Sequence, residues 1–282
     1  VLAKLEKDYG KEFVHFGGLK IFTTLDTRYQ QFALRGARNH LEALQGKVKK
    51  ETGSVKLQVA LVAIENKSGA VKALLGGRNY SHSQFNRAVS NNRLPGSSFK
   101  PFVYLTAMET LGLSPATVVV DEPVTIEIPG SKSWEPQNFD KEFAGSIVLK
   151  KALLKSINVV SAKLMQQVGP EKVIRTARKF GIKSPLGKNL SLALGTSGVA
   201  PLEIASAYSV IANLGIYNEP YLIQQIEDFQ GNRLYEHYYQ GVQQFSPDTL
   251  YPLLDMMQGV VERGTGRIIR RMGFKHPAAG KT

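Results

Sequence analysis

Hydrophobic residues near the start of the chain alternate in one stretch and recur at helical spacing in the next. The alternation in segment 19–26 predicts a strand, and Asp26 is placed to cap a helix from Thr27 to about Leu44. The stripe of that helix expected to face a core comprises Phe32, Ala33, Ala37, Leu41 and Leu44. Residues 1–18 are mixed in polarity and end in a glycine pair, so we expect them to form a linker outside the core.

Two pairs of apolar, β-branched runs predict hairpins. Segments 57–64 and 71–75 are separated by Asn66-Lys67-Ser68-Gly69, which is typical turn chemistry. Segments 221–228 and 233–237 form a second pair of the same kind. Both pairs predict antiparallel strands.

The middle of the chain is dominated by helical spacing. A helix is expected to begin at Ser97, after Pro95-Gly96, and to end at Gly112, whereas segment 113–143 is rich in Pro, Gly and Asp and predicts a surface excursion. Further helices are predicted over Ile147–Lys155, Val159–Val168, Pro170–Phe180, Pro201–Asn213 and from Ser246-Pro247 to about Arg263. Strands combined with a helical block indicate an α+β fold with a sheet and a helical lobe.

Composition narrows the class of protein without choosing a function. A chain of 282 residues with 43% hydrophobic residues can bury a large core, as one large domain or one with a small accessory piece. Its formal charge of +13 suits polyanions in general, whether nucleic acid, anionic lipid or acidic cell-wall polymer. The basic residues are scattered, which does not favour a nucleic-acid site. Because there is no cysteine, disulfides, thiolate metal sites and cysteine nucleophiles are excluded.

No stretch of the sequence approaches the ~18 to 20 apolar residues that span a bilayer. The chain starts at Val1 without Met and stops at Thr282, so we expect it to be a piece of a longer protein, with any membrane anchor outside it.

The strongest chemical signal is the pair Ser97 and Lys100. A lysine one helical turn after a serine brings the amine beside the hydroxyl, and a partly desolvated lysine can act as a base. The start of a helix also favours developing negative charge. Ser-x-x-Lys is a weak pattern by itself, but it occurs only once in this chain.

Two weaker elements follow in order. Ser156-Ile157-Asn158 lies at the junction of two predicted helices, although Ser90-Asn91-Asn92 matches the same pattern and either could be a helix cap. Lys281-Thr282, preceded by Gly280, ends the chain. A phosphate-binding loop is disfavoured there because Lys275 stands where that motif needs glycine.

Other constellations are poor. The histidines are dispersed without metal-ligand spacing, so no metal site or cofactor is expected; they are His15, His40, His82, His237 and His276. Gly195-Thr196-Ser197-Gly198 lacks the last glycine of a nucleophile elbow. Trp134, Pro136, Gln137 and Asn138 could line a cleft, with a packed loop aromatic as an equal alternative.

In this order Ser-x-x-Lys, Ser-x-Asn and Lys-Thr match the signature of penicillin-recognising acyl-serine enzymes. Several longer segments resemble class A, bifunctional penicillin-binding proteins, most closely the 1b branch: GGLKIFTTLDTRYQ, RLPGSSFKPFVYLTAME, WEPQNFDKEF, LLKSINVVSAKLM, LGTSGVAPLEIASAYSVIANLG, VVERGTGR and AAGKT. The resemblance covers nearly the whole chain. It implies a penicillin-binding transpeptidase fold, an antiparallel sheet covered by helices beside a helical lobe.

The resemblance also implies residue roles. Ser97 would attack the carbonyl of the penultimate D-Ala of a peptidoglycan stem peptide, with Lys100 as base. Ser156 and Lys281 would return the proton to the leaving nitrogen. Asn158 and Thr282 would bind substrate, Asn158 through an amide and Thr282, with Lys281, through the carboxylate.

The resemblance implies further parts at both ends. Residues 1–18 would be the linker from a glycosyltransferase domain, and residues 19–282 a transpeptidase domain incomplete at its C-terminus. The motif at Lys281 would continue with Gly and Thr or Ser, on a strand that supplies one of two oxyanion-hole N–H groups. Because loss of one such donor costs ~10²- to 10³-fold in rate, residues 1–282 alone are expected to be poorly active or inactive.

The implied setting is the outer face of the bacterial cytoplasmic membrane. Implied partners are stem peptides, a lipid-linked precursor, β-lactams, the membrane through an N-terminal anchor, and other cell-wall synthesis proteins. Nucleic acid is not among them. Alternatives left open are a D,D-carboxypeptidase, a β-lactamase or β-lactam sensor, and a non-catalytic basic module that binds cell-wall polymer or nucleic acid.

Overall fold

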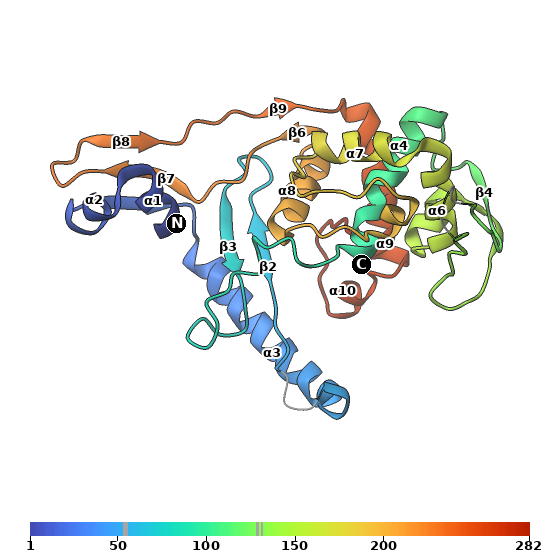
Figure 1. The fold of residues 1–282 in the computed structure, drawn as a ribbon, viewed down its shortest axis with the longest axis horizontal. Coiled ribbons are helices and arrows are strands. Elements are labelled where there is room, and N and C mark those ends of the chain that lie inside the picture. The colour runs from blue at the N-terminus through green and yellow to red at the C-terminus, as the bar shows by residue number, and fades with distance from the viewer. Residues whose placement is uncertain (53–55, 128–129, 131) are drawn as a thin grey trace. The chain divides into compact units, whose positions relative to one another are not determined.

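The chain folds as two compact units, which are described separately. The computed structural model describes residues 1–52, 56–127, 130 and 132–282. The first unit contains Val1–Ser90 and Asn218–Val242, and the second contains Asn91–Tyr217 and Gln243–Thr282 (Figure 1). No helix in these described ranges is long and apolar enough to cross a membrane. The sequence predicted a boundary between a linker and a domain at residue 18. The division into two units does not test that boundary, which stays a prediction.

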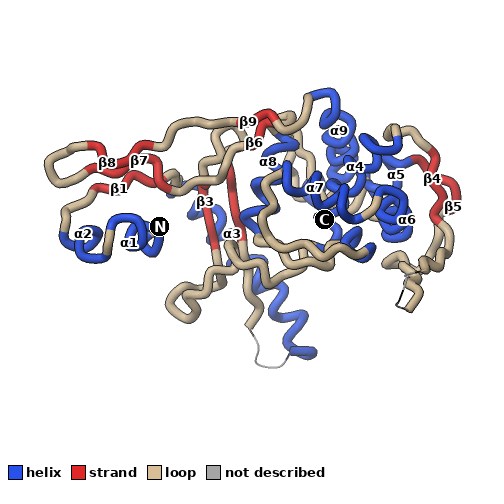
Figure 2. The backbone as a smooth tube through the Cα atoms, turned by 45° about the horizontal axis from the view of Figure 1, so that its top comes forward, coloured by secondary structure: helices blue, strands red, loops and turns tan. Residues whose placement is uncertain are grey.

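The first unit combines small antiparallel sheets with helices (Figure 2). Its elements are α1 (Leu2–Tyr9), α2 (Lys11–Phe16), β1 (Lys20–Thr23), α3 (Thr27–Thr52), β2 (Leu61–Ile64), β3 (Val71–Leu75), β7 (Ile223–Glu227) and β8 (Arg233–Glu236). One sheet has the order β1-β7-β8, and β2 pairs with β3. Ile21 pairs with Ile226, which pairs with Tyr235, so these three side chains share one face.

Residues 2–16 fold as the helices α1 and α2, where the sequence pattern predicted a linker outside the core. Leu5 is 1% exposed and packs with Ile223 and Ile226 of β7. The expectation that the segment lies outside a core is therefore wrong for Leu5, whereas its role as a linker between domains stays a prediction. Its apolar residues are covered by a strand more than 200 positions later, which local periodicity does not reveal.

Helix α3 begins as predicted and runs further than predicted, to Thr52. Asp26 caps it by accepting a hydrogen bond of 2.9 Å from the Arg28 backbone N–H. Ala33 and Leu41 are buried as expected, but Phe32 is 65% exposed, and the Arg35 guanidinium lies over its ring. Since neighbouring helical residues differ by about 100°, a stripe through positions 33, 37 and 41 turns Phe32 outward.

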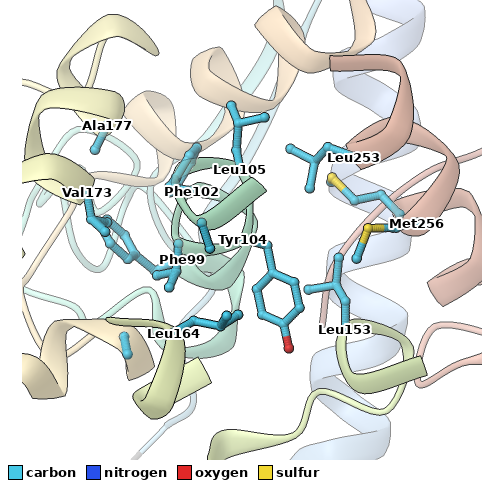
Figure 3. Close-up of a cluster of buried hydrophobic side chains, with 14 of the residues drawn as sticks. Phe99, Phe102, Tyr104, Leu105, Leu153, Leu164, Val173, Ala177, Leu253 and Met256 are labelled. Atoms are coloured by element: carbon cyan, nitrogen blue, oxygen red, sulfur yellow. The ribbon is translucent and has the colours of Figure 1, made fainter. Parts of the chain in front are cut away.

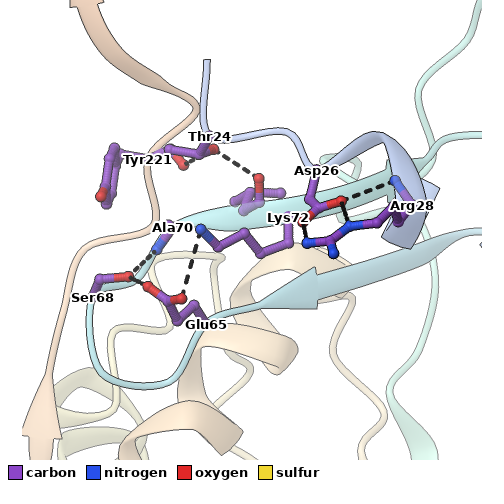
Figure 4. A network of polar contacts seen from close by, with 9 residues as sticks. Thr24, Asp26, Arg28, Glu65, Ser68, Ala70, Lys72 and Tyr221 are labelled. Atoms are coloured by element: carbon purple, nitrogen blue, oxygen red, sulfur yellow. Dashed lines mark hydrogen bonds and ion pairs between the residues drawn. The ribbon is translucent and has the colours of Figure 1, made fainter. Parts of the chain in front are cut away.

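Polar contacts fix the turn between β2 and β3 and the end of β1 (Figure 4). Ser68 Oγ donates to Glu65 and accepts from the Ala70 N–H at 3.2 Å, which closes the predicted turn. Thr24 Oγ1 donates to the carbonyl oxygens of Val71 at 2.7 Å and Tyr221 at 3.2 Å. Thr24 thereby ties three distant segments of this unit together.

The second unit is mainly helical. Its elements are η1 (Gly96–Phe99), α4 (Lys100–Leu111), β4 (Val118–Asp121), β5 (Gly145–Val148), α5 (Leu149–Leu154), α6 (Asn158–Val168), α7 (Pro170–Lys179), η2 (Leu190–Leu194), α8 (Pro201–Ala212), β6 (Ile216–Tyr217), α9 (Pro247–Arg263) and α10 (Ile268–Arg271), and β9 (Val242–Gln243) lies at its boundary. Strand β4 pairs with β5 antiparallel. Ser246 caps α9 as a helix start, since its Oγ accepts from the Thr249 N–H.

Helix α4 runs through the core of the second unit, with α6, α7 and α9 packed on it (Figure 3). Phe102 and Leu105 of α4 are fully buried, as is Phe99 of the preceding η1. Figure 3 shows Leu164 of α6 and Met256 of α9 facing the same cluster. Residues 100–107 of α4 are buried on all sides and held by packing, so the first turn of the helix has a fixed position.

Two predictions in this unit are wrong in detail. Ile147 lies in strand β5, so the helix predicted from Ile147 begins at Leu149 instead. Segment 113–143 is not only a surface excursion, because Asp121 and Ile126 are fully buried and Asn138 is 5% exposed. Residues 128–129 and 131 of this segment lie outside the described part of the chain.

The predicted antiparallel pairing is confirmed for both hairpins. The strands of the described residues do not form one large central sheet but belong to several small ones. An isolated bridge between Ala70 and Tyr221 joins the β2-β3 pair to the chain entering β7. Strand type follows from local pattern, whereas partner choice depends on segments far apart in sequence.

Candidate active site

The second unit brings the predicted site residues together at the N-terminal end of α4. Ser97 lies in η1, directly after Gly96, whose φ of 57° is left-handed. The Lys100 backbone N–H donates to the Ser97 carbonyl, so the short helix continues into α4. This geometry places Ser97 and Lys100 one turn apart, as predicted.

Lys100 is fully buried and its ammonium nitrogen is surrounded by oxygen atoms. Its Nζ lies 2.6 Å from the Ser156 carbonyl oxygen, 2.7 Å from Asn158 Oδ1 and 3.3 Å from Ser156 Oγ. Residues from α4 and from the junction of α5 and α6 therefore meet at this nitrogen. Both predicted motifs converge although they lie more than 50 positions apart.

Burial, and to a smaller extent the charge of the nearby Lys281 ammonium, lowers the pKa of Lys100 to about 7. The surrounding oxygens favour the charged form, but removal of the amine from water is the larger effect. The neutral amine of Lys100 is therefore accessible near neutral pH.

Ser156 occupies an unusual backbone position between α5 and α6. Its φ is 58°, in the left-handed region where residues other than glycine are uncommon. This conformation turns its carbonyl toward Lys100, while its Oγ lies 2.8 Å from Lys281 Nζ. One hydroxyl thus links the two lysines.

The end of the chain lies against α9 and the loop after it. The Gly280 N–H donates to the Met257 carbonyl at 3.2 Å, and Thr282 Oγ1 lies 2.6 Å from Thr265 Oγ1. Burial lowers the pKa of Lys281 to about 8. Lys281 is therefore held beside Ser156, and Thr282 beside Thr265 of the segment VVERGTGR.

One expected contact is not formed in this structure. Among the described residues, no hydrogen bond joins Ser97 Oγ to Lys100 Nζ, whose partners are Ser156 and Asn158. The side chain of the neighbouring Ser98 is engaged instead with the Pro95 carbonyl at 2.6 Å. Ser97 is partly exposed.

The loop that begins at Gly195 packs against the loop that carries Ser97. The sequence analysis had noted only that this segment lacks the last glycine of a nucleophile elbow. Gly195 has a φ of 69°, and a Cβ added there would lie 2.2 Å from the Gly96 carbonyl oxygen. The Gly96 N–H donates to the Gly195 carbonyl at 3.3 Å, and Tyr208 Oη donates to the Ser98 carbonyl at 2.8 Å. The sequence could have marked Gly195 as the glycine that ends a short helix. Its contact with Gly96 could not be predicted from sequence spacing.

Of the residues expected to line a cleft, Gln137 and Asn138 do reach the site. The Gln137 carbonyl accepts a hydrogen bond of 2.9 Å from Asn158 Nδ2. Asn138 is buried behind it and bonds to the carboxylate of Asp121, a residue that the sequence analysis missed. In the described ranges no three His, Asp or Glu side chains gather as metal ligands.

The second unit thus places a helix-start serine, a buried lysine, a linking serine and a second lysine together. Comparison with known proteins identifies the family. The chain belongs to the penicillin-binding protein transpeptidase domain family, whose model matches residues 59–282. It is 43% identical over 181 residues, 64% of its length, to penicillin-binding protein 1A of Pseudomonas aeruginosa. It is 40% identical over 235 residues, 80% of its length, to penicillin-binding protein 1A of Neisseria lactamica.

A crystal structure of penicillin-binding protein 1A from Haemophilus influenzae has the same fold, with a TM-score of 0.88 at 22% identity, over 99% of this chain and 60% of that one. The matches span 22% and 29% of the Pseudomonas and Neisseria relatives. The class A resemblance and the α+β transpeptidase fold are confirmed. These relatives carry the name 1A, so the closer likeness to the 1b branch stays a prediction.

Proposed function

We propose that this chain is the peptidoglycan D,D-transpeptidase domain of a bacterial cell-wall synthase and that it works through an acyl-enzyme on Ser97. The observation that carries the proposal is the fully buried Lys100, one turn after Ser97, with a pKa lowered to about 7. Membership of the transpeptidase domain family supports the reaction class. The individual residue roles are those that the family resemblance implies, and the contacts of the site support them.

Lys100 is the base in the acylation step. As a neutral amine it has two N–H groups, which match its two short contacts, to the Ser156 carbonyl at 2.6 Å and to Asn158 Oδ1 at 2.7 Å. Its lone pair then remains for a hydroxyl proton. With substrate bound, the Ser97 hydroxyl would approach that lone pair, since catalytic hydrogen bonds that are long in apo sites commonly tighten on binding.

The reaction transfers one acyl group and one proton. Ser97 Oγ forms a bond to the carbonyl carbon of the penultimate D-Ala, and its proton passes to Lys100. When the bond to the terminal D-Ala nitrogen breaks, that nitrogen takes up a proton through Ser156 Oγ, which lies between the two lysines. An acceptor amine, or water, then attacks the ester and releases Ser97.

Residues next to Lys100 and Ser156 would bind the substrate. Lys281 supplies positive charge for the terminal carboxylate, and Thr282 supplies a hydroxyl that is now paired with Thr265. Asn158 Nδ2, now on the Gln137 carbonyl, supplies a donor for a substrate amide. A β-lactam carries a carboxylate and a strained amide at similar positions, which fits the name of the relatives.

The wider setting is proposed on the family resemblance. We place the domain on the outer face of the cytoplasmic membrane, after a linker formed by residues 1–18, with an anchor and a glycosyltransferase domain earlier in the whole protein. One molecule would then polymerise glycan strands from a lipid-linked precursor and cross-link their stem peptides. The oxyanion hole would take one N–H from Ser97 and the other from a strand after Thr282.

The proposal is tested with a peptide ending in D-Ala-D-Ala and a D-amino acid as acceptor amine. Release of D-Ala with formation of the exchanged peptide is expected, and Ser97→Ala abolishes both. The assay is run on residues 1–282 and on a protein that continues past Thr282. Release of D-Ala without the exchanged peptide would identify a carboxypeptidase, and no release from either protein would contradict the proposal.

A further inference from the structure

The first residue of helix α6 is Asn158, which contacts Lys100. No side chain at the N-cap position of this helix caps it. The residue before it is Ile157, which makes no side-chain cap bond. The carboxamide oxygen of Asn138, 20 residues earlier, accepts instead from the Asn158 N–H at 3.0 Å and from the Val159 N–H at 3.2 Å. Two of the N–H groups that a helix start leaves unsatisfied are bound from outside the helix.

The orientation of the Asn138 carboxamide is itself fixed. Its Nδ2 donates to both oxygens of Asp121, at 2.9 and 3.1 Å, and to the Glu142 carbonyl at 2.9 Å. A flipped carboxamide would place its oxygen against a carboxylate and its NH2 against two N–H donors. Because every neighbour would then be mismatched, only one orientation is allowed.

Asp121 determines the orientation of the Asn138 carboxamide. It is fully buried, and its remaining contact is with the Ala144 N–H at 2.9 Å. Within the described residues no lysine or arginine forms an ion pair with it. A carboxylate only accepts hydrogen bonds, so it holds the donating end of Asn138 and leaves the accepting end for α6.

The same loop also fixes the side chain of Asn158. The Gln137 carbonyl holds Asn158 Nδ2 at 2.9 Å, so Oδ1 of the same carboxamide faces Lys100 Nζ at 2.7 Å. Residues 137 and 138 thus determine both the backbone and the side-chain direction of Asn158. Asn158 in turn is one of the two close contacts of the buried amine.

We infer that the buried pair Asp121 and Asn138 positions Asn158, and through it Lys100, for acylation of Ser97. Neither residue touches the reacting atoms, so both are positioning residues. The inference rests on the proposed acyl-serine function. It goes beyond that function because it assigns a role to an irregular segment outside the three motifs.

The test uses the intact protein, a penicillin and stopped-flow kinetics, which separate the acylation rate constant from the dissociation constant of the complex that precedes it. Asn138→Ala is expected to lower the rate constant by about ten- to hundredfold, since small misplacements have effects of this size. The dissociation constant should change by less than about threefold, and backbone amide exchange at Asn158 and Val159 should become faster.

A charge swap keeps the test decisive if Asn138→Ala folds poorly. Asn138→Asp alone places two carboxylates together and should be slow. Asp121→Asn with Asn138→Asp restores a donor opposite an acceptor, although the Glu142 carbonyl loses its donor, and should recover part of the rate. Ser246→Ala is the matched control, because it removes a helix cap in the same unit, from α9. It should lower stability and leave the rate constant unchanged.

The outcomes separate the two claims. An unchanged rate constant in Asn138→Ala, an equal loss in Ser246→Ala, or no recovery in the swap would overturn the positioning role. If the unmodified protein forms no acyl-enzyme at all, the proposed function fails, and amide exchange decides the positioning claim. Unchanged exchange at Asn158 and Val159 would overturn it in that case.

Discussion

Lys100 and Lys281 share one hydroxyl group, since Ser156 Oγ lies 3.3 Å from the first Nζ and 2.8 Å from the second. Two ammonium groups around one small oxygen repel each other, and both are partly or fully removed from water. Their protons are therefore coupled. The site can hold one neutral and one charged lysine near neutral pH, which is the combination that acylation requires.

The acylation rate should follow a bell-shaped pH profile. Lys100 must be deprotonated to act as base, so the rate rises with pH through about 7. Lys281 must be charged to bind a carboxylate and return a proton, so the rate falls through about 8. The two apparent pKa values belong to the coupled pair. Acylation by a penicillin, measured between about pH 5 and pH 10, checks this; a flat profile would contradict it.

Replacement of Lys281 should remove the falling limb of the pH profile and shift the rising limb. Lys281→Met removes a positive charge that lowers the pKa of Lys100, so the rising limb shifts to higher pH and the falling limb disappears. The overall rate drops as well. Lys172→Met, on the exposed side of α7, is the control and should leave both limbs in place. A rising limb that stays in place in Lys281→Met would show that the lysines are not coupled.

Gly195 should be essential for the geometry of the Ser97 loop. In Gly195→Ala the new Cβ would lie 2.2 Å from the Gly96 carbonyl oxygen, so one of the two loops must move. Acylation is expected to fall by about 10²-fold. Gly112→Ala is a close control, because its φ of 64° gives the same strain but nothing lies within 4 Å of a Cβ there. It should cost about 1 kcal/mol of stability and no acylation rate; equal rate losses in the two variants would refute the role of Gly195.

The hydroxyl of Ser156 can be separated from its backbone conformation. Ser156→Gly keeps a residue that adopts a φ of 58° without strain but removes the group between the two lysines. Acylation should fall by about 10²-fold or more while the free energy of unfolding stays the same or rises. Ser156→Ala should be equally slow and less stable than Ser156→Gly. Normal acylation in either variant would exclude Ser156 from proton transfer.

Sequence reasoning succeeded where chemistry is local. Ser97 and Lys100 are one turn apart on a helix whose start and stop are marked by Pro95-Gly96 and Gly112, and the structure has that helix. The meeting of Ser156 with Lys281 was expected only from the family resemblance, because 125 positions separate them. No periodicity encodes a contact of that range.

Burial that the sequence analysis did not predict depends on tertiary contacts. Asp121 and Asn138 lie in a stretch predicted to be a surface excursion, and their burial depends on α6 covering them. Leu5 is buried by a strand from the far end of the first unit. In each case the local pattern is polar or mixed, and a distant partner decides whether the side chain is buried.

The central claim is that Ser97 is the nucleophile, and intact-mass spectrometry after incubation with a penicillin tests it most directly. The unmodified protein, continued past Thr282, should gain the mass of one opened β-lactam. Ser98→Ala should gain it too, because the Ser98 hydroxyl is bound to the Pro95 carbonyl. Ser97→Ala should gain nothing. An adduct that persists in Ser97→Ala, or that never forms in the unmodified protein, would contradict the account.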